Sequence, residues 1–199
     1  MTADSAPSPK DGGRRPQLET ARLILRPVQE GDAERIQELA SAREVAATTL
    51  RIPHPYPADG GIEFVKMCLS LDPARGECPF AIVPRGSEGL IGLCGLEPEF
   101  THRQSEMGYW IGVPYWGRGY ATEAAAALLR FAFLDLDLHR VHAAYFSNNP
   151  ASGRVMEKLG MRFEGIYREH ILKYGEFLDL HVYAILRREW QERAPGKVA

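Results

Sequence analysis

The stretch MGYWIGVPYWGRGYATEA, residues Met107–Ala124, decides the fold that we predict for this chain. Its first part is rich in aromatic and β-branched residues, which favours a strand at Glu106–Val113. Its last part opens an alanine-rich helix, Ala121–Leu134, whose apolar residues recur at helical spacing. Gly117 and Gly119 separate the two and predict a tight turn.

A strand, a glycine-rich turn and a helix N-terminus together predict a site for an anion. The first N–H groups of a helix have no helical partner and lie at the positive end of its dipole. We therefore expect the N–H groups of residues 119–122 and the Thr122 hydroxyl to face phosphate oxygens, with Gly117 and Gly119 letting a pyrophosphate reach the backbone. The P-loop pattern is absent, and Thr122 replaces the third glycine of a dinucleotide fingerprint.

Turn residues and hydrophobic periodicity predict the elements on either side of this stretch. Further strands are expected at Thr20–Val28, Phe80–Val83, Leu90–Leu96, Arg140–Phe146, Arg162–Lys173 and Asp179–Arg187, the last two as a hairpin. Further helices are expected from an Asp32 cap to Ser41, from Ala58 to Leu71 with Ile62, Val65, Met67 and Leu69 toward the core, and from Asn149-Pro150 to Gly160. The segment Ile52–Pro57 contains three prolines and is expected to be a loop that lines a cleft.

These elements predict one α/β (α+β) domain with a mixed, mostly antiparallel central sheet of about six or seven strands flanked by about four helices. We place this domain at residues 19–191. A disordered tail is expected at residues 1–18, which are rich in Pro, Ser, Gly and charge, and a short tail is expected at residues 192–199.

Composition narrows the classes of function. The formal net charge is −2, which removes the broad basic face expected of a nucleic-acid-binding protein. No run reaches the roughly 20 apolar residues of a membrane span, and residues 1–18 have no apolar run of the kind found in a signal peptide. Cys68, Cys78 and Cys94 lack the spacing of a zinc site or a disulfide framework, and Cys94 lies in an apolar pattern typical of a core. We expect a cytoplasmic protein without a metal, a nucleic-acid partner or a membrane partner.

The order of strand, glycine-rich turn, alanine-rich helix, strand and Asn-Pro-Ala-Ser helix resembles the core of the GNAT acetyltransferases, over almost all of residues 20–190. The family's pyrophosphate motif, Q/R-x-x-G-x-G/A, maps onto Trp116–Ala121. Gly119 and Ala121 match this motif, whereas Trp116 replaces the usual Gln or Arg.

Other segments resemble the RimJ/RimL branch of this family. They are the opening TARLILRP, the PYWG segment that contains Trp116, the Asn-Pro-Ala-Ser helix, the EKLGM stretch that ends at Met161 and the Tyr174–Phe177 turn. Members of this branch acetylate protein N-termini, notably those of ribosomal proteins, while other relatives act on small amines. The resemblance thus implies acetyl-CoA as the co-substrate and a primary amine as the acceptor.

The resemblance also assigns the contacts to acetyl-CoA. In the family, two strands splay apart and the pantetheine arm binds between them. Backbone groups of Trp110, Ile111 and Gly112 are therefore expected to bind this arm as they would an added strand. Asn149 is expected to add a further contact to it. With the turn, the expected cofactor-binding residues are Trp110, Ile111, Gly112, Gly117, Arg118, Gly119, Tyr120, Ala121, Thr122 and Asn149.

Acetyl transfer needs a proton acceptor for the amine and a proton donor for the leaving thiolate. Glu106, ten residues before Trp116, resembles the base of the histone-acetylating GNATs in its spacing, and the alternative is a solvated strand-end carboxylate. Ser152 resembles the serine proposed as the acid in this branch and lies in a helix's first turn, where the alternative is a capping residue. Many GNATs place a tyrosine acid where this chain has Met156, which leaves Tyr167 and Tyr174 in reserve.

The acceptor is expected to be a peptide or protein N-terminus, because the Arg51–Pro57 segment carries no acidic residue that would attract a polycation. His54 in this segment is a candidate for lining the acceptor pocket. Two alternatives stay open: an acetyltransferase of small-molecule amines and a CoA-binding module without turnover. The protein is expected to be a monomer or a homodimer.

Overall fold

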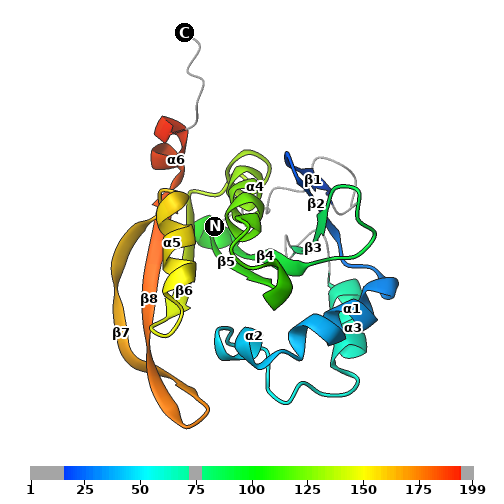
Figure 1. Cartoon of the computed structure of the whole chain (residues 1–199). Coiled ribbons are helices and arrows are strands. Elements are labelled where there is room, and N and C mark those ends of the chain that lie inside the picture. The colour runs from blue at the N-terminus through cyan, green and yellow to red at the C-terminus, as the bar shows by residue number, and fades with distance from the viewer. Residues whose placement is uncertain (1–15, 72–77, 194–199) are drawn as a thin grey trace.

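The computed structural model describes residues 16–71 and 78–193, and these form a sheet with helices on both faces (Figure 1). The sheet order is β1-β2-β3-β4-β5-β6-β8-β7, and every neighbouring pair is antiparallel except β5–β6, which is parallel. The strands are β1 (Leu18–Glu19), β2 (Leu23–Pro27), β3 (Cys78–Pro84), β4 (Gly92–Glu99), β5 (Gln104–Ile111), β6 (Arg140–Phe146), β7 (Arg162–Lys173) and β8 (Glu176–Leu186).

The helices divide between the two faces. Helices α4 (Tyr120–Leu134) and α5 (Pro150–Lys158) pack on one face over the larger apolar core, and α1 (Ala33–Ala40) and α3 (Gly60–Ser70) cover the other face over a smaller one. The remaining helical segments are α2 (Arg43–Ala47), α6 (Arg187–Arg193) and the 3₁₀ turns η1 (Glu30–Asp32), η3 (Phe100–His102) and η4 (Val113–Tyr115).

The parallel pair β5–β6 creates the feature that positions the site. Pairing between these strands covers only Gln104–Glu106 against Arg140–His142. Beyond this point β5 continues to Ile111 with β4 as its partner, and β6 continues to Phe146 with β8. The two strands therefore diverge, and within residues 16–71 and 78–193, positions 107–111 of β5 have one edge without a strand partner. We call this divergence, which begins at Glu106 and His142, the fork.

Helix α4 lies along the core because its buried side is built of small and branched apolar residues. Ala124, Ala125 and Leu128 are fully buried, and Leu129 and Ala132 continue the same stripe. Alanine side chains let a helix approach a sheet closely, so the N-terminus of α4 is held firmly at the end of the glycine-rich turn.

Several predicted elements need correction. Eight strands and six α-helices are present in the described part of the chain, against about six or seven strands and about four helices predicted. Leu18, predicted in the tail, belongs to β1 and pairs with Leu25, while residues 1–15 and 194–199 of the two expected tails lie outside the described residues. The predicted C-terminal boundary at 191 falls within α6. Short elements such as β1, α2 and α6 hold too few residues for a periodic pattern to show.

The buried side of α3 was also predicted wrongly. Val65 and Cys68 are buried, whereas Ile62, Met67 and Leu69 are about half exposed. The reason is Gly61, where an added Cβ would lie 2.2 Å from the Ala33 carbonyl oxygen of α1. The two helices cross closely at this glycine, which fixes the stripe 61, 65, 68 as the contact face.

Asp32 precedes α1 as predicted, but its side chain does not cap that helix. Its carboxylate instead receives two hydrogen bonds from the Arg26 guanidinium, at 2.7 and 2.8 Å, and one from the Gln29 N–H at 2.8 Å. Asp32 is buried, so this paired charge fastens the η1 turn to β2.

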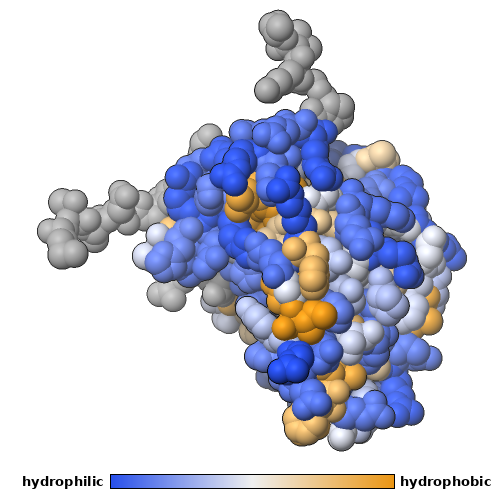
Figure 2. Space-filling model, turned by 90° about the vertical axis from the view of Figure 1, so that its left-hand side faces the viewer, coloured by the Kyte–Doolittle hydropathy of each residue, from blue (hydrophilic) through white to orange (hydrophobic). Residues whose placement is uncertain are grey.

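The outer edge of the sheet is the long hairpin β7–β8. Figure 2 views this side of the molecule and shows hydrophobic patches on a mostly polar surface. Exposed hydrophobic side chains of the hairpin are Phe163, Ile166, Leu172 and Phe177. Register shifts between Phe163 and Gly165 and between Tyr167 and Ile171 interrupt the regular ladder, which makes β7 a poor template for pairing with another strand.

Candidate active site

The glycine-rich turn has the backbone that an anion site requires. Gly117 and Gly119 have φ angles of 74° and 80°, in the left-handed region that glycine adopts without strain. Gly119 is the N-cap of α4, and no side chain caps this end. The N–H groups of the first turn therefore receive no side-chain cap at Gly119, and that they bind an anion stays a prediction.

Arg22, which the sequence reasoning did not single out, connects this turn to the start of β2. Its guanidinium donates to the Arg118 carbonyl at 3.0 Å and to the Glu123 carboxylate at 2.6 Å, and lies 4.9 Å from the centre of the Tyr120 ring. The contact spans about a hundred residues of sequence, so no local pattern reveals it. Arg22 braces the turn and adds positive charge beside it.

Glu123 anchors the same corner. Burial disfavours its charged form, but hydrogen bonds from the Thr20 hydroxyl at 2.7 Å, the Arg22 N–H at 2.8 Å and the Arg22 guanidinium outweigh this and hold the pKa of Glu123 below its ordinary value. Glu123 is thus paired with Arg22. Arg118 of the turn is exposed, and its guanidinium lies over the Tyr115 ring, 5.8 Å from the ring centre.

The free edge of β5 corrects part of the predicted pantetheine contact. The Gly112 N–H donates to the Ile91 carbonyl at 2.8 Å, so this group serves the sheet. Trp110 pairs with Leu93 of β4, and the alternation of a strand directs the backbone groups of Trp110 toward β4 as well. Tyr109 and Ile111 therefore present backbone groups to the fork, and the Ile111 carbonyl accepts a hydrogen bond from the Trp116 indole at 2.6 Å.

Helix α5 brings its first turn toward β5. Asn149 is the N-cap, and its side-chain oxygen accepts from the Ser152 N–H at 3.3 Å. Since Asn149 supplies the cap, the Ser152 hydroxyl is left for another role, and it lies 2.9 Å from the Tyr109 hydroxyl. Burial raises the pKa of Tyr109 to about 12, with the hydrogen bond to Ser152 opposing, so the phenol stays protonated near neutral pH.

The Tyr109–Ser152 pair joins the free edge of β5 to α5. Two hydroxyl groups in contact can relay a proton, because each can donate and accept. Sequence analysis placed Tyr109 only in the strand and missed this contact. The two reserve tyrosines, Tyr167 and Tyr174, lie on the β7–β8 hairpin with about half of each side chain exposed.

Glu106 and Glu97 lie beside each other on β5 and β4 at the start of the fork. Arg51, from the segment before α3, makes a bidentate ion pair with Glu97, one of whose hydrogen bonds measures 2.7 Å. Glu106 is exposed. On the other side of the fork, His142 of β6 is the register partner of Glu106.

The proline-rich loop is held against the hairpin tip. Lys173 donates to the Thr49 carbonyl at 2.8 Å and to the Ile52 carbonyl at 3.0 Å, and burial lowers the pKa of its ammonium group. His54 in this loop is exposed. Cys94 is fully buried in the core as predicted, and burial raises the pKa of its thiol.

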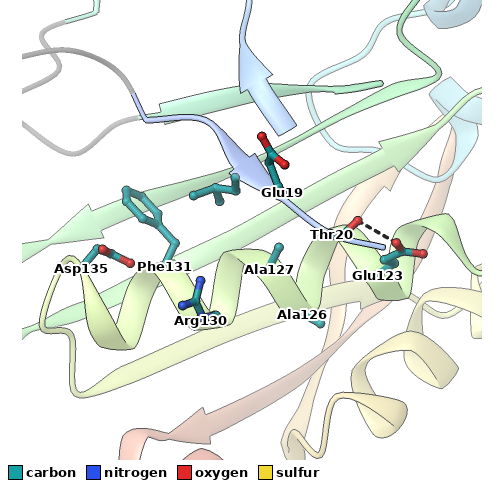
Figure 3. A pocket seen from close by; sticks show the side chains of 9 residues that line it. Glu19, Thr20, Glu123, Ala126, Ala127, Arg130, Phe131 and Asp135 are labelled. Carbon is teal, nitrogen blue, oxygen red and sulfur yellow. Dashed lines mark hydrogen bonds between the residues drawn. The ribbon is translucent and has the colours of Figure 1, made fainter. Parts of the chain in front are cut away.

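A separate hollow of about 320 Å³ lies between β1 and α4 (Figure 3). Glu19, Thr20, Glu123 and Arg130 are among its lining residues, and none of the predicted site residues lines it. Glu19 is paired with Arg85, and Glu123 with Arg22. These two carboxylates are thus already engaged in holding β1 and β2 in place.

The fold and this site define an acetyl-CoA-dependent N-acetyltransferase. The profile of the "Acetyltransferase (GNAT) domain" family matches residues 22–162, and the chain belongs to this family, as its motifs predicted.

Named relatives bear this out. The chain is 31% identical over 186 residues to the [ribosomal protein uS5]-alanine N-acetyltransferase of Escherichia coli K12, covering 90% of this chain and 94% of that protein. The crystal structure of a GNAT-family acetyltransferase from Bacillus anthracis has a TM-score of 0.76 at 30% identity, covering 87% of this chain and 99% of that one. The spermidine N-acetyltransferase from Vibrio cholerae, in complex with CoA and spermine, has a TM-score of 0.75 at 25% identity, covering 86% and 99%.

Two further observations concern partners. In residues 16–71 and 78–193 no group of three or more His, Cys, Asp or Glu side chains is arranged to hold a metal ion. None of the helices in the same ranges has the length and apolar character to cross a bilayer.

Proposed function

We propose that this enzyme acetylates the α-amine of a peptide or protein N-terminus. The observation that carries the proposal is the ion pair between Arg51 and Glu97. Glu97 and Glu106 are adjacent carboxylates at the fork. The ion pair with Arg51 neutralises Glu97 and leaves Glu106 for the acceptor. A single free carboxylate suits one ammonium group, whereas a polyamine is held better by several.

Two further features support a peptide acceptor. The Arg51–Pro57 segment adds no acidic residue to this side of the molecule, and Lys173 fixes the loop against the hairpin, which places another cation there. One relative with full-length similarity is named as an acetyltransferase of a ribosomal protein's alanine. Together these favour a peptide main chain that carries one amine over a polycation.

The proposed residues would share the work as follows. The N–H groups at the start of α4, with Arg118, would hold the pyrophosphate of acetyl-CoA, and the backbone of Tyr109 and Ile111 would hold its pantetheine arm. Glu106 would take a proton from the acceptor amine, either directly or through a water molecule. The amine nitrogen then bonds to the thioester carbon and the C–S bond breaks.

Ser152 would return a proton to the departing sulfur. Its hydroxyl lies in the first turn of α5, where the positive end of the helix dipole also stabilises a thiolate. Tyr109, protonated and in hydrogen-bond contact with Ser152, would supply the replacement proton. This pair gives the chain an acid although Met156 stands where many relatives have tyrosine.

A competition assay tests the choice of acceptor. The enzyme is incubated with acetyl-CoA, an N-terminal peptide library and equimolar spermidine, kanamycin and free amino acids, and kcat/KM is compared for each. We expect the best peptide to exceed spermidine by more than about tenfold, or about 1.4 kcal/mol of transition-state discrimination. In Arg51→Met, which frees Glu97, the ratio should move toward spermidine.

The control for charge alone is Arg43→Met, which removes a cation from α2 that lies over the Tyr174 ring. This control should leave the ratio unchanged. A preference for a small amine by more than about tenfold in the wild type would overturn the peptide assignment and leave the acetyltransferase intact.

A further inference from the structure

His142 lies at the point where the fork opens. It is the last residue of β6 paired with β5, and its register partner is Glu106. Adjacent strands run about 4.8 Å apart, and registered residues of neighbouring strands project to the same face of a sheet. The preceding pair, Ser105 and Val141, is buried in the core on the opposite face. Glu106 and His142 therefore project side by side from the face that α1 and α3 partly cover.

One ring nitrogen of His142 lacks a hydrogen bond in the described part of the chain. Its Nδ1 is buried, and within the described part of the chain it has no hydrogen-bond partner. A buried polar atom without a partner costs about 1–3 kcal/mol, and such atoms are uncommon in folded proteins. A histidine kept only to fill the core would not need this atom there.

Three charged side chains lie around His142. Glu106 faces it from β5, Arg140 lies two residues away on β6, and Glu164 of β7 is paired with Arg140. From β8 the register partner is Ala184, which carries no charge. Burial is the largest influence and lowers the pKa of His142, while Glu106 opposes it. The imidazole is thus neutral near pH 7 and able to accept a proton.

We propose that His142 and Glu106 act as one unit that accepts the proton released by the acceptor amine. This inference rests on the acetyl transfer described under "Proposed function" and adds a second member to its base. The amine nitrogen bonds to the thioester carbon, the C–S bond breaks with its electron pair on sulfur, and Ser152 protonates that sulfur. The proton leaving the nitrogen is shared by the His142 imidazole and the Glu106 carboxylate, and passes to solvent after product release.

Sharing has a physical advantage over a lone carboxylate. A carboxylate is in general a weak base near neutral pH, whereas an imidazole titrates much closer to that range. The carboxylate in turn stabilises the imidazolium that forms beside it. A buried water molecule can complete the hydrogen bond of Nδ1, which is too buried for the acceptor amine to contact directly.

The test uses four variants: His142→Asn, Glu106→Gln, the double variant, and His102→Asn as a matched control. Asparagine keeps a polar atom near the position of Nδ1 but does not titrate. His102 lies in η3 with most of its side chain exposed, away from the fork. Each variant is checked by its melting temperature and its affinity for CoA, and kcat/KM is then measured against pH with the amine that the competition assay ranks first.

We expect His142→Asn to lower kcat/KM near pH 7 by at least about tenfold, with little change in CoA affinity, and to move the acidic limb of the pH profile of kcat/KM by more than about half a unit. The double variant should be no more than about threefold worse than Glu106→Gln, because members of one unit are not additive. His102→Asn should behave as the wild type.

Three results would overturn the unit. The first is a pH profile of His142→Asn that equals that of the wild type. The second is a loss of activity in His142→Asn without a shift of the acidic limb. The third is a loss in the double variant that equals the product of the losses in the two single variants. If His142→Asn fails to fold, His142→Gln is measured by the same criteria. A wild-type enzyme that acetylates no amine would instead refute the proposed function.

Discussion

Substituting Gly119 by valine tests the cofactor site most sharply, because the structure predicts two separable effects. Gly119 has a φ of 80°, a conformation in which a β-branched residue is strained by about 1–3 kcal/mol. For a chain of this size that corresponds to a fall in Tm of roughly 2–12 °C. An added Cβ would lie 3.4 Å from the Arg22 guanidinium, so the site itself has room and the variant is expected to fold.

The second effect is on acetyl-CoA. The valine side chain would stand where the pyrophosphate must approach the N–H groups of α4, so we expect the affinity measured by calorimetry to fall at least about 100-fold, or about 2.7 kcal/mol. Gly86→Val is the matched control, because Gly86 has a φ of 79° and an added Cβ there meets nothing within 4 Å. It should lose similar stability and keep its affinity. Unchanged affinity in a folded Gly119→Val would refute the site.

Four further results are expected. Glu106→Gln should lower kcat about 10²- to 10⁴-fold with little change in acetyl-CoA affinity, and equal activity near pH 7 would return Glu106 to a solvated carboxylate. Ser152→Ala should lower kcat, and this loss should become smaller at high pH, where the leaving thiolate needs less help from an acid. A loss that does not change with pH would indicate that Ser152 only positions other groups. Glu123→Gln should lower Tm at pH 7. Because the pKa of Glu123 is lower in the folded state than in the unfolded state, the difference in Tm between variant and wild type should narrow as pH falls below about 4.3. A difference that stays constant with pH would contradict this. Removing residues 1–17 should leave Tm and CoA affinity nearly unchanged, because the pairing of Leu18 with Leu25 remains; a large fall in Tm would count against it.

Local patterns foretold the elements that carry strong local signals. The helix at Tyr120–Leu134 begins one residue from its predicted start, and Asn149 and Pro150 are the N-cap and first residue of α5, as expected. In both cases the deciding residues lie within one turn of the element they define, so sequence alone is enough.

Contacts between distant segments could not be foretold. Arg22 meets Arg118 and Tyr109 meets Ser152, across separations that only the folded sheet brings together. The same holds for His142, whose importance depends on where the pairing of β5 and β6 stops. The sequence also did not reveal that the Gly112 N–H donates within the sheet, because the direction of each backbone group depends on the register with β4, which the residue pattern leaves open.

The central claim is that the fork catalyses acetyl transfer to an amine and does more than bind CoA. The most direct measurement follows the free thiol of CoA and the mass of the peptide products in one reaction with acetyl-CoA and an N-terminal peptide library. The account predicts thiol release matched by peptides that carry one added acetyl group on the α-amine, and neither signal in Gly119→Val. Tight binding of acetyl-CoA without thiol release in the presence of any amine would contradict it and leave a CoA-binding module.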